Sequence, residues 1–341
     1  MAATVLEADT RRWVSRGGWR ALLAAALGLA ASSCGLTRST NPAPQPVVLQ
    51  LSWTHQAQFA GFYAADQNGY YGDEGLAVSF VEGGPSLSPW REVVEGRGDF
   101  GVTSGDQVLL ARAESNPVVA LATIYRRSPR VFIALAESGI RRPQDFVGHT
   151  ISVGRGGSPF LDAMMQRLGI SPDQYTVVGS TPDLAPLYQG EVQVRYVFLT
   201  NEVITAQAAG YALNVIYPDD YGIHFYSDTL FTNDELLAND PDLALRFVRA
   251  TLKGWTWAAE HPAAIGPMVQ AYAPQADAGL ETAKMTASLP LINTGEDYIG
   301  WMKPEMWAAM EETLREQGVL TSPLDVESAY TLQFLQEIYG K

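Results

Sequence analysis

The sequence predicts an α/β fold of two lobes with a ligand-binding cleft between them. From Val47 to Ile216, short apolar segments typical of strands alternate with segments of helical periodicity. Such alternation is typical of parallel sheets joined by crossover helices. It starts again after Arg142-Pro143, which indicates a second sheet, and beyond Asp240-Pro241 only helices are expected. We therefore assign residues 47–134 and 227–341 to the first lobe and residues 135–226 to the second, with the cleft at the strand ends where α/β proteins bind ligands.

The first 33 residues have the three parts of an export signal. Four arginines precede an apolar segment from Ala21 to Ala31, and small residues then lead to Cys34. A basic segment, a short hydrophobic segment and a small-residue cleavage site are typical of a signal peptide. The apolar segment is too short for a membrane-spanning helix, which needs about 20 residues. We expect residues 1–33 to be removed and Cys34 to be lipidated as in a bacterial lipobox; an ordinary secretory signal that contains a cysteine is the alternative.

Composition excludes several kinds of partner. Residues 34–46 comprise Cys34 and a polar, proline-rich stretch, and we expect a flexible tether there. The net charge is −14, and such an acidic excess argues against nucleic acid or an anionic bilayer as the surface that is bound. Cys34 is the only cysteine and the four histidines are scattered. The sequence therefore predicts no internal disulfide, no metal site and no cofactor.

The expected elements follow the chain in two series and a helical tail. For the first series we predict strands at 47–53, 76–81, 100–103, 118–124 and 131–135, and helices at 59–67, 90–95 and 107–113. For the second series we predict strands at 150–153, 175–178, 194–198 and 213–216, and helices at 160–168, 185–189 and 203–209. The tail contributes helices at 243–260, 263–272, 280–288, 304–317 and 326–339. Asp240 is expected to cap the first tail helix, with Pro241 in its first turn.

The stretch from Leu51 to Leu76 is the strongest candidate for ligand contacts. A strand ends at Trp53, and a helix opens near Gln58. Free N–H groups at a helix start can hold an acceptor-rich ligand. Phe59 and Tyr63 lie beside that helix start, although their helical spacing is equally typical of core residues.

Other candidates follow later strands. Ser104, in Ser104-Gly105-Asp106, lies at the end of a strand, where a loop would face the cleft. Gly156 and Ser158 lie in a glycine-rich turn whose backbone amides can grip polar ligand edges, or which simply caps a helix. Asn201 and Glu202 place an amide and a carboxylate at a strand exit, where they can orient a ligand ring or form a solvated helix start. The aromatic pool adds Tyr125 and Tyr221.

Three of these segments carry a family resemblance. The first is Gln56-Ala57-Gln58-Phe59-Ala60-Gly61-Phe62-Tyr63-Ala64-Ala65, the others are Thr200-Asn201-Glu202 and Tyr221-Gly222-Ile223. They resemble the extracytoplasmic solute-binding proteins of ABC importers in the thiamine-pyrimidine-synthase-like group, and the resemblance extends over residues 47–341. It implies a periplasmic-binding-protein-like fold of type II. It also implies a flat heterocyclic ligand and, as partners, the permease and ATPase subunits of an importer at the outer face of the cell membrane.

The resemblance leaves the ligand open. Riboflavin and a pyrimidine precursor of thiamine are both flat rings, and the large aromatic pool favours riboflavin. The rival class is enzymatic, because the eukaryotic branch of the group makes the thiamine pyrimidine with the help of a cysteine-rich motif. This chain has no cysteine beyond Cys34, and it has no serine nucleophile elbow. We therefore expect a binding protein that is not an enzyme.

Overall fold

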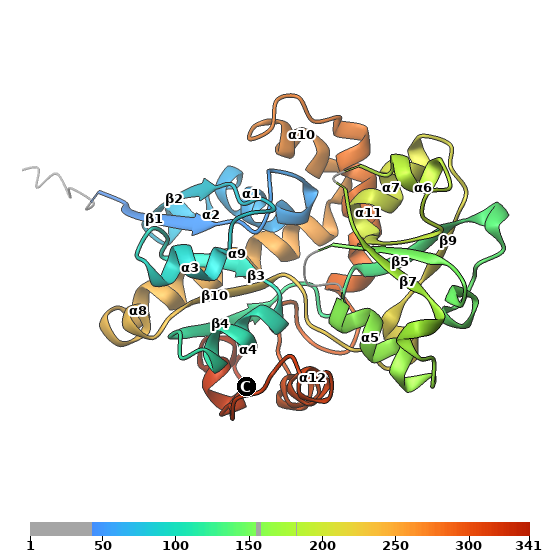
Figure 1. The fold of residues 1–341 in the computed structure, drawn as a ribbon. Helices are drawn as coiled ribbons and strands as arrows, with labels where there is room; N and C mark the ends of the chain where they lie inside the picture. The colour runs from blue at the N-terminus through green and yellow to red at the C-terminus, as the bar shows by residue number, and fades with distance from the viewer. Residues whose placement is uncertain (1–42, 155–157, 182) are drawn as a thin grey trace, which may run out of the picture. The chain divides into compact units, whose positions relative to one another are not determined.

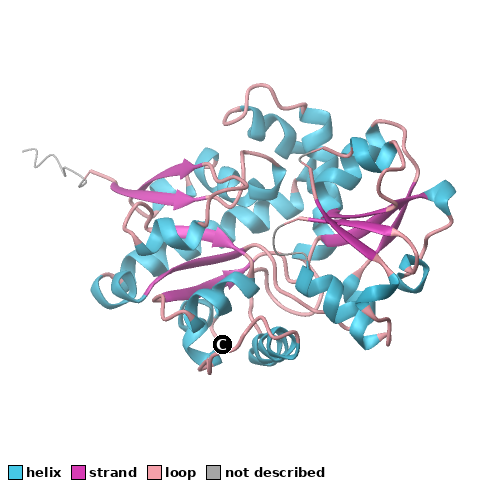
Figure 2. Cartoon of the chain, viewed as in Figure 1, coloured by secondary structure: helices cyan, strands magenta, loops and turns pink. Residues whose placement is uncertain are grey.

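The computed structural model describes residues 43–154, 158–181 and 183–341. Cys34, the signal segment, most of the tether and Gly156 lie outside the described residues, as does the side chain of Ser158. The strands form two separate groups (Figure 2), each a five-stranded sheet. None of the helices in the described ranges has the length and apolarity needed to cross a bilayer.

The first sheet has the strand order β2-β1-β3-β10-β4. Its strands are β1 (Gln45–Gln50), β2 (Leu76–Val81), β3 (Phe100–Thr103), β4 (Val118–Thr123) and β10 (Thr229–Asn233). β1 runs parallel to β2 and to β3, whereas β10 is antiparallel to both of its neighbours. All six residues of β4 are buried, as expected for a strand that is covered on both faces.

The second sheet has the order β7-β6-β8-β5-β9. Its strands are β5 (Arg130–Leu135), β6 (Thr150–Val153), β7 (Thr176–Gly179), β8 (Val194–Phe198) and β9 (Leu213–Ile216). β5 is antiparallel to β8 and β9. The predicted lobe boundary after residue 134 therefore differs from the pairing, because β5 hydrogen-bonds in the second sheet. The chain crosses between the sheets before Arg130.

Helices cover both sheets (Figure 1). Those of the first series are α1 (Ala60–Gln67), α2 (Tyr70–Asp73), α3 (Pro89–Val94) and α4 (Gly105–Ala113). Those of the second are α5 (Ser158–Arg167), α6 (Ala185–Tyr188) and α7 (Ile204–Ala208). The tail holds α8 (Asp234–Asn239), α9 (Pro241–Glu260), α10 (Ile265–Gln270), α11 (Ala278–Ile292), α12 (Pro304–Glu316) and α13 (Gln333–Tyr339).

α9 is the long helix that packs on α1. It begins as predicted, with the Asp240 carboxylate accepting from the Leu243 amide at 3.0 Å. Gly61 and Gly254 let the two helices approach closely, because a Cβ at Gly254 would overlap the carbonyl oxygen of Gly61. Trp255 is fully buried beside this crossing.

The α/β prediction is confirmed, and each predicted strand has a counterpart within a few residues. β10 and α8 were not predicted. β10 is five residues long and its partners β3 and β4 lie more than 100 residues earlier in the chain, so local periodicity carries little sign of it. Both antiparallel strands, β5 and β10, come directly after the chain has crossed from one sheet to the other.

Candidate ligand-binding site

A group of polar side chains connects the two sheets where the chain crosses between them. We call it the inter-sheet polar cluster; it consists of Gln58, Ser104, Asp106, Arg130, Tyr196 and Asp228. Ser104 follows β3, Asp106 lies in the first turn of α4, and Asp228 directly precedes β10. Gln58 comes from the 3-10 turn η1 (Ala57–Phe59), and Arg130 and Tyr196 come from β5 and β8 of the second sheet.

Arg130 is the cation of this cluster. Its guanidinium lies 3.5 Å from Asp106 Oδ1 and donates to Ser104 Oγ at 3.2 Å. The side chains of Arg130 and Asp106 are 16% and 5% exposed, so the pair is largely shielded from water. Burial acts to lower the pKa of Arg130, but the Tyr196 hydroxyl and the carboxylates of Asp106 and Asp228 outweigh it, and the pKa is raised. The guanidinium also lies over the ring of Phe160, 5.1 Å from its centroid, where a cation–π attraction adds to the ion pair.

Asp228 is a buried carboxylate that can accept a further hydrogen bond. The residue is 4% exposed, and its Oδ1 accepts from Gln58 Nε2 at 2.6 Å. Within the described part of the chain, Oδ2 is buried and has no hydrogen-bond partner. Burial raises the pKa of Asp228 to about 6, against the opposing effects of the Gln58 bond and of Arg130. A carboxylate oxygen without a partner in such a place can accept a bond from a ligand.

α11 determines the position of Gln58. The Glu281 carboxylate accepts from the backbone amide of Ala57 at 2.6 Å, and Lys284 Nζ donates to its other oxygen at 2.7 Å. Glu281 and Lys284 are both buried. This pair therefore holds the first residue of η1, next to Gln58, and the amide of Gln58 is then directed at Asp228. Asn or Gln side chains held in this way are pre-organised for binding.

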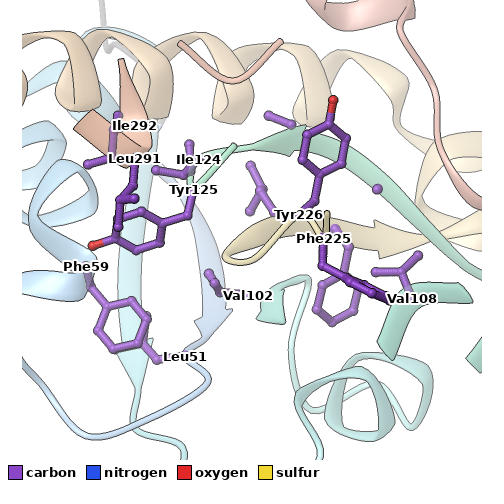
Figure 3. Close-up of a cluster of buried hydrophobic side chains, with 14 of the residues drawn as sticks. Leu51, Phe59, Val102, Val108, Ile124, Tyr125, Phe225, Tyr226, Leu291 and Ile292 are labelled. Carbon is purple, nitrogen blue, oxygen red and sulfur yellow. The ribbon is translucent and has the colours of Figure 1, made fainter. Parts of the chain in front are cut away.

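Three of the predicted aromatic contacts are core residues. Phe59, Tyr63 and Tyr125 are fully buried, and Figure 3 shows Phe59 and Tyr125 in a cluster of buried apolar side chains. Tyr63 stacks on Tyr272 with centroids 4.3 Å apart, so one face of its ring is already paired. The Tyr125 hydroxyl donates to Ser288 of α11 at 3.0 Å. Of the predicted aromatic candidates, Trp53 is the exposed one, with 39% of its surface accessible.

Of the predicted site residues in the second-sheet region, Glu202 is connected to the cluster through Phe198, whereas Tyr221 lies in a separate turn. Asn201 and Glu202 are half-buried in the π-helical turn η5 (Leu199–Val203). Glu202 accepts from the backbone amide of Phe198 at 3.0 Å, and the ring of Phe198 lies 5.7 Å from the Arg130 guanidinium. Glu202 thus supports a residue that contacts the cluster. Tyr221 is half-buried in the turn η6 (Pro218–Tyr221), which packs against β5 and α5, and the charged groups that act on its hydroxyl are Asp220, Arg142 and Asp145.

Sequence reasoning named Gln58 and Ser104 but missed Arg130, Tyr196 and Asp228. Arg130 directly precedes the apolar run Val131–Leu135, and Asp228 follows the buried residues Phe225 and Tyr226. A single charge at the edge of an apolar segment is the signal that could have identified both, since buried charges are rare unless they are paired. Tyr196, within a strand, gives no such signal.

Known proteins match this chain along most of its length. The family described as NMT1/THI5 like matches residues 56–265. The riboflavin-binding protein RibY of Chloroflexus aurantiacus is 30% identical over 90% of this chain and 90% of its own length. The formylaminopyrimidine-binding protein of Halalkalibacterium halodurans is 26% identical, covering 91% of this chain and 96% of that protein. A 4-amino-5-hydroxymethyl-2-methylpyrimidine phosphate synthase of Legionella pneumophila is 24% identical over 85% of this chain and 92% of the synthase.

A solved structure supports the fold. The periplasmic aliphatic sulphonate binding protein SsuA of Escherichia coli superposes with a TM-score of 0.67 at 13% identity, covering 84% of this chain and 92% of that one. The expectation of a periplasmic-binding-protein-like fold is thereby confirmed. With a family match over most of the described residues and a relative at 30% identity along nine-tenths of the sequence, the chain belongs to the NMT1/THI5-like family.

Proposed function

We propose that this protein is the extracytoplasmic solute-binding component of an ABC importer and that its solute is riboflavin. The observation that carries the proposal is the inter-sheet polar cluster, which joins the two sheets and in which Oδ2 of Asp228 has no hydrogen-bond partner among the residues described. Two-lobed binding proteins enclose ligands between their lobes, and the cluster lies where the chain crosses. The similarity to a riboflavin-binding protein supports this choice of ligand.

The proposed site combines polar and aromatic groups. Arg130, Asp228 and Gln58 supply donors and an acceptor for the ring edge, while Phe160 and Phe198 place aromatic surface beside Arg130. Trp53, Asn201, Glu202 and Tyr221 remain proposed contacts at the rim of the same site. Phe59, Tyr63 and Tyr125 are core residues close to these groups in the chain: Phe59 directly follows Gln58, and the backbone carbonyl of Tyr125 accepts from the amide of Ser227, next to Asp228.

Binding without chemical change is the function we favour over synthesis of the thiamine pyrimidine. The two relatives with the highest identities reported above are both named as binding proteins. The chain also contains no cysteine other than Cys34, so it has no counterpart of a cysteine-rich catalytic motif. The second candidate ligand is a formylaminopyrimidine, since a relative named for binding it covers nearly the whole chain.

Riboflavin should bind to the purified protein and lose its own fluorescence. A flavin held against aromatic rings is quenched by stacking contacts, so emission should fall as protein is added, and calorimetry should give a saturable heat. A formylaminopyrimidine, titrated in parallel, should give much less heat. Tight binding of the pyrimidine with neither heat nor quenching from riboflavin would overturn the choice of ligand and leave the solute-binding proposal standing. If neither compound binds, both proposals are wrong.

We also propose that Cys34 anchors the protein to the membrane after removal of residues 1–33. Cys34→Ser should move the protein from the membrane fraction of a bacterial host to the soluble extract, because the acyl chains would have no attachment point. Mass spectrometry of the unaltered protein should show a chain that begins at Cys34 with added acyl mass. Ser33→Ala, one residue away, is the matched control and should stay in the membrane fraction. A Cys34→Ser protein that remains there would refute the anchor.

A further inference from the structure

The side chain of Asp228 has one oxygen in use and one that is free to accept. Oδ1 accepts from Gln58, and Oδ2 is buried with no partner among the described residues. The hydroxyl of Tyr196 is buried beside the Arg130 guanidinium. A buried carboxylate oxygen without a hydrogen bond is unfavourable, so the free oxygen of Asp228 indicates that a ligand donates to it.

The side chains around Asp228 determine which pattern of hydrogen-bond donors and acceptors a ligand needs in order to bind there. Arg130 can only donate, the Tyr196 hydroxyl can donate or accept, and an ionised carboxylate can only accept. The side chains of Tyr196 and Asp228 both lie close enough to Arg130 to influence its pKa. The cluster therefore offers an acceptor with strong donors near it. The complementary ligand edge carries an N–H with a carbonyl oxygen beside it.

The carboxylate is available as an acceptor at neutral pH. Burial raises the pKa of Asp228, but the hydrogen bond from Gln58 and the positive charge of Arg130 both act to lower it and so favour the ionised form. Hydrogen bonds that involve an ionised group are roughly twice as strong as those between neutral groups. The bond to an uncharged ligand N–H would therefore contribute substantially to affinity.

Resting on the proposed function, we infer that Asp228 orients the flavin ring by accepting its imide N–H, with Arg130 or Tyr196 donating to an adjacent carbonyl oxygen. The imide edge of riboflavin is an N–H between two carbonyl groups, and a donor flanked by acceptors matches a carboxylate that has donors beside it. Asp228 is thus assigned as the residue that fixes which edge of the ring enters the site.

The test compares riboflavin with riboflavin methylated at the imide nitrogen. The unaltered protein should bind the methylated compound about a hundredfold more weakly or worse, because the donor is lost and the methyl group meets a buried carboxylate. Asp228→Ala removes the acceptor and makes room for the methyl group. The variant should bind riboflavin about ten- to a hundredfold more weakly than the unaltered protein does, and its preference against the methylated compound should disappear.

Controls separate a direct contact from a structural effect. Asp173→Ala changes an exposed carboxylate of the second-sheet region and should retain both affinities. Asp228→Asn keeps the size of the side chain and should also weaken riboflavin binding, which provides a second variant if alanine impairs folding. In the unaltered protein, riboflavin labelled with nitrogen-15 at the imide position should show an N–H signal protected from exchange with water.

The outcomes distinguish this inference from the function on which it rests. If riboflavin binds the unaltered protein, but Asp228→Ala binds it equally well or keeps the full preference against the methylated ring, the role of Asp228 is wrong and the proposed function stands. A rapidly exchanging imide proton in the complex would contradict the role as well. If the unaltered protein binds no riboflavin, the inference and the choice of ligand fail together.

Discussion

Arg130→Met should lower the free energy of unfolding by about 3–5 kcal/mol and abolish measurable riboflavin binding. The change leaves the carboxylate of Asp106, which is 5% exposed, without its cation. It also removes the donor to Ser104 and the only cation we place in the proposed ligand site. Denaturant unfolding at pH 7 would measure the first effect, and calorimetry with riboflavin the second.

Two further variants make this expectation specific. Arg127→Met removes a cation three residues earlier that pairs with Asp219 at 2.9 Å but is 46% exposed. Exposed pairs contribute about 1 kcal/mol or less, so its loss should be small and binding should persist. The double variant Arg130→Met, Asp106→Asn should regain much of the lost stability but none of the binding. An Arg130→Met protein as stable as Arg127→Met would show that the buried pair does not stabilise the fold.

Gly254→Ala should destabilise the protein by about 1–3 kcal/mol, the usual cost of overpacking a core. The added methyl group would meet the Gly61 carbonyl and the backbone of Ala65 where α9 crosses α1. Backbone atoms cannot rotate away as a flexible side chain could, so the two helices must move apart. Thermal unfolding monitored by circular dichroism would show a lower midpoint.

Gly72→Ala is the matched control for the helix crossing. Gly72 lies in α2, and a Cβ there has open space around it. Alanine in place of glycine within a helix typically stabilises by about 0.5–1 kcal/mol, so this variant should unfold at a slightly higher temperature. Equal unfolding midpoints for the Gly254 and Gly72 variants would mean that the close approach of α1 and α9 does not restrict the side chain at position 254.

The sequence could predict most strands because their signals are local. Val118–Thr123 and Phe100–Thr103 are short apolar runs between polar or glycine-rich segments, and they became β4 and β3. The antiparallel strand β10 escaped prediction because a five-residue strand is defined by its partners. Pairing across more than 100 residues leaves no periodicity in the sequence near Thr229.

The candidate site could be predicted only in part, for the same reason. Gln58 and Ser104 follow strand ends, a position that favours ligand contacts in α/β folds. The importance of Asp228 arises from Gln58, which is 170 residues away in sequence. Likewise, Arg130 becomes a cluster residue through Asp106 and the rings of the second sheet. A family resemblance can identify the class of binder, but the polar contacts themselves depend on tertiary structure.

The position of β10 has a consequence for the order in which the chain can fold. β10 lies between β3 and β4, yet it follows every strand of the second sheet in sequence. Until residues 229–233 emerge from the ribosome, β3 and β4 each lack the strand that pairs with them in the folded protein. The second sheet is contained within residues 130–216 and is complete earlier. We therefore expect it to assemble first, while the incomplete first sheet relies on delayed folding or a chaperone to avoid edge-to-edge aggregation.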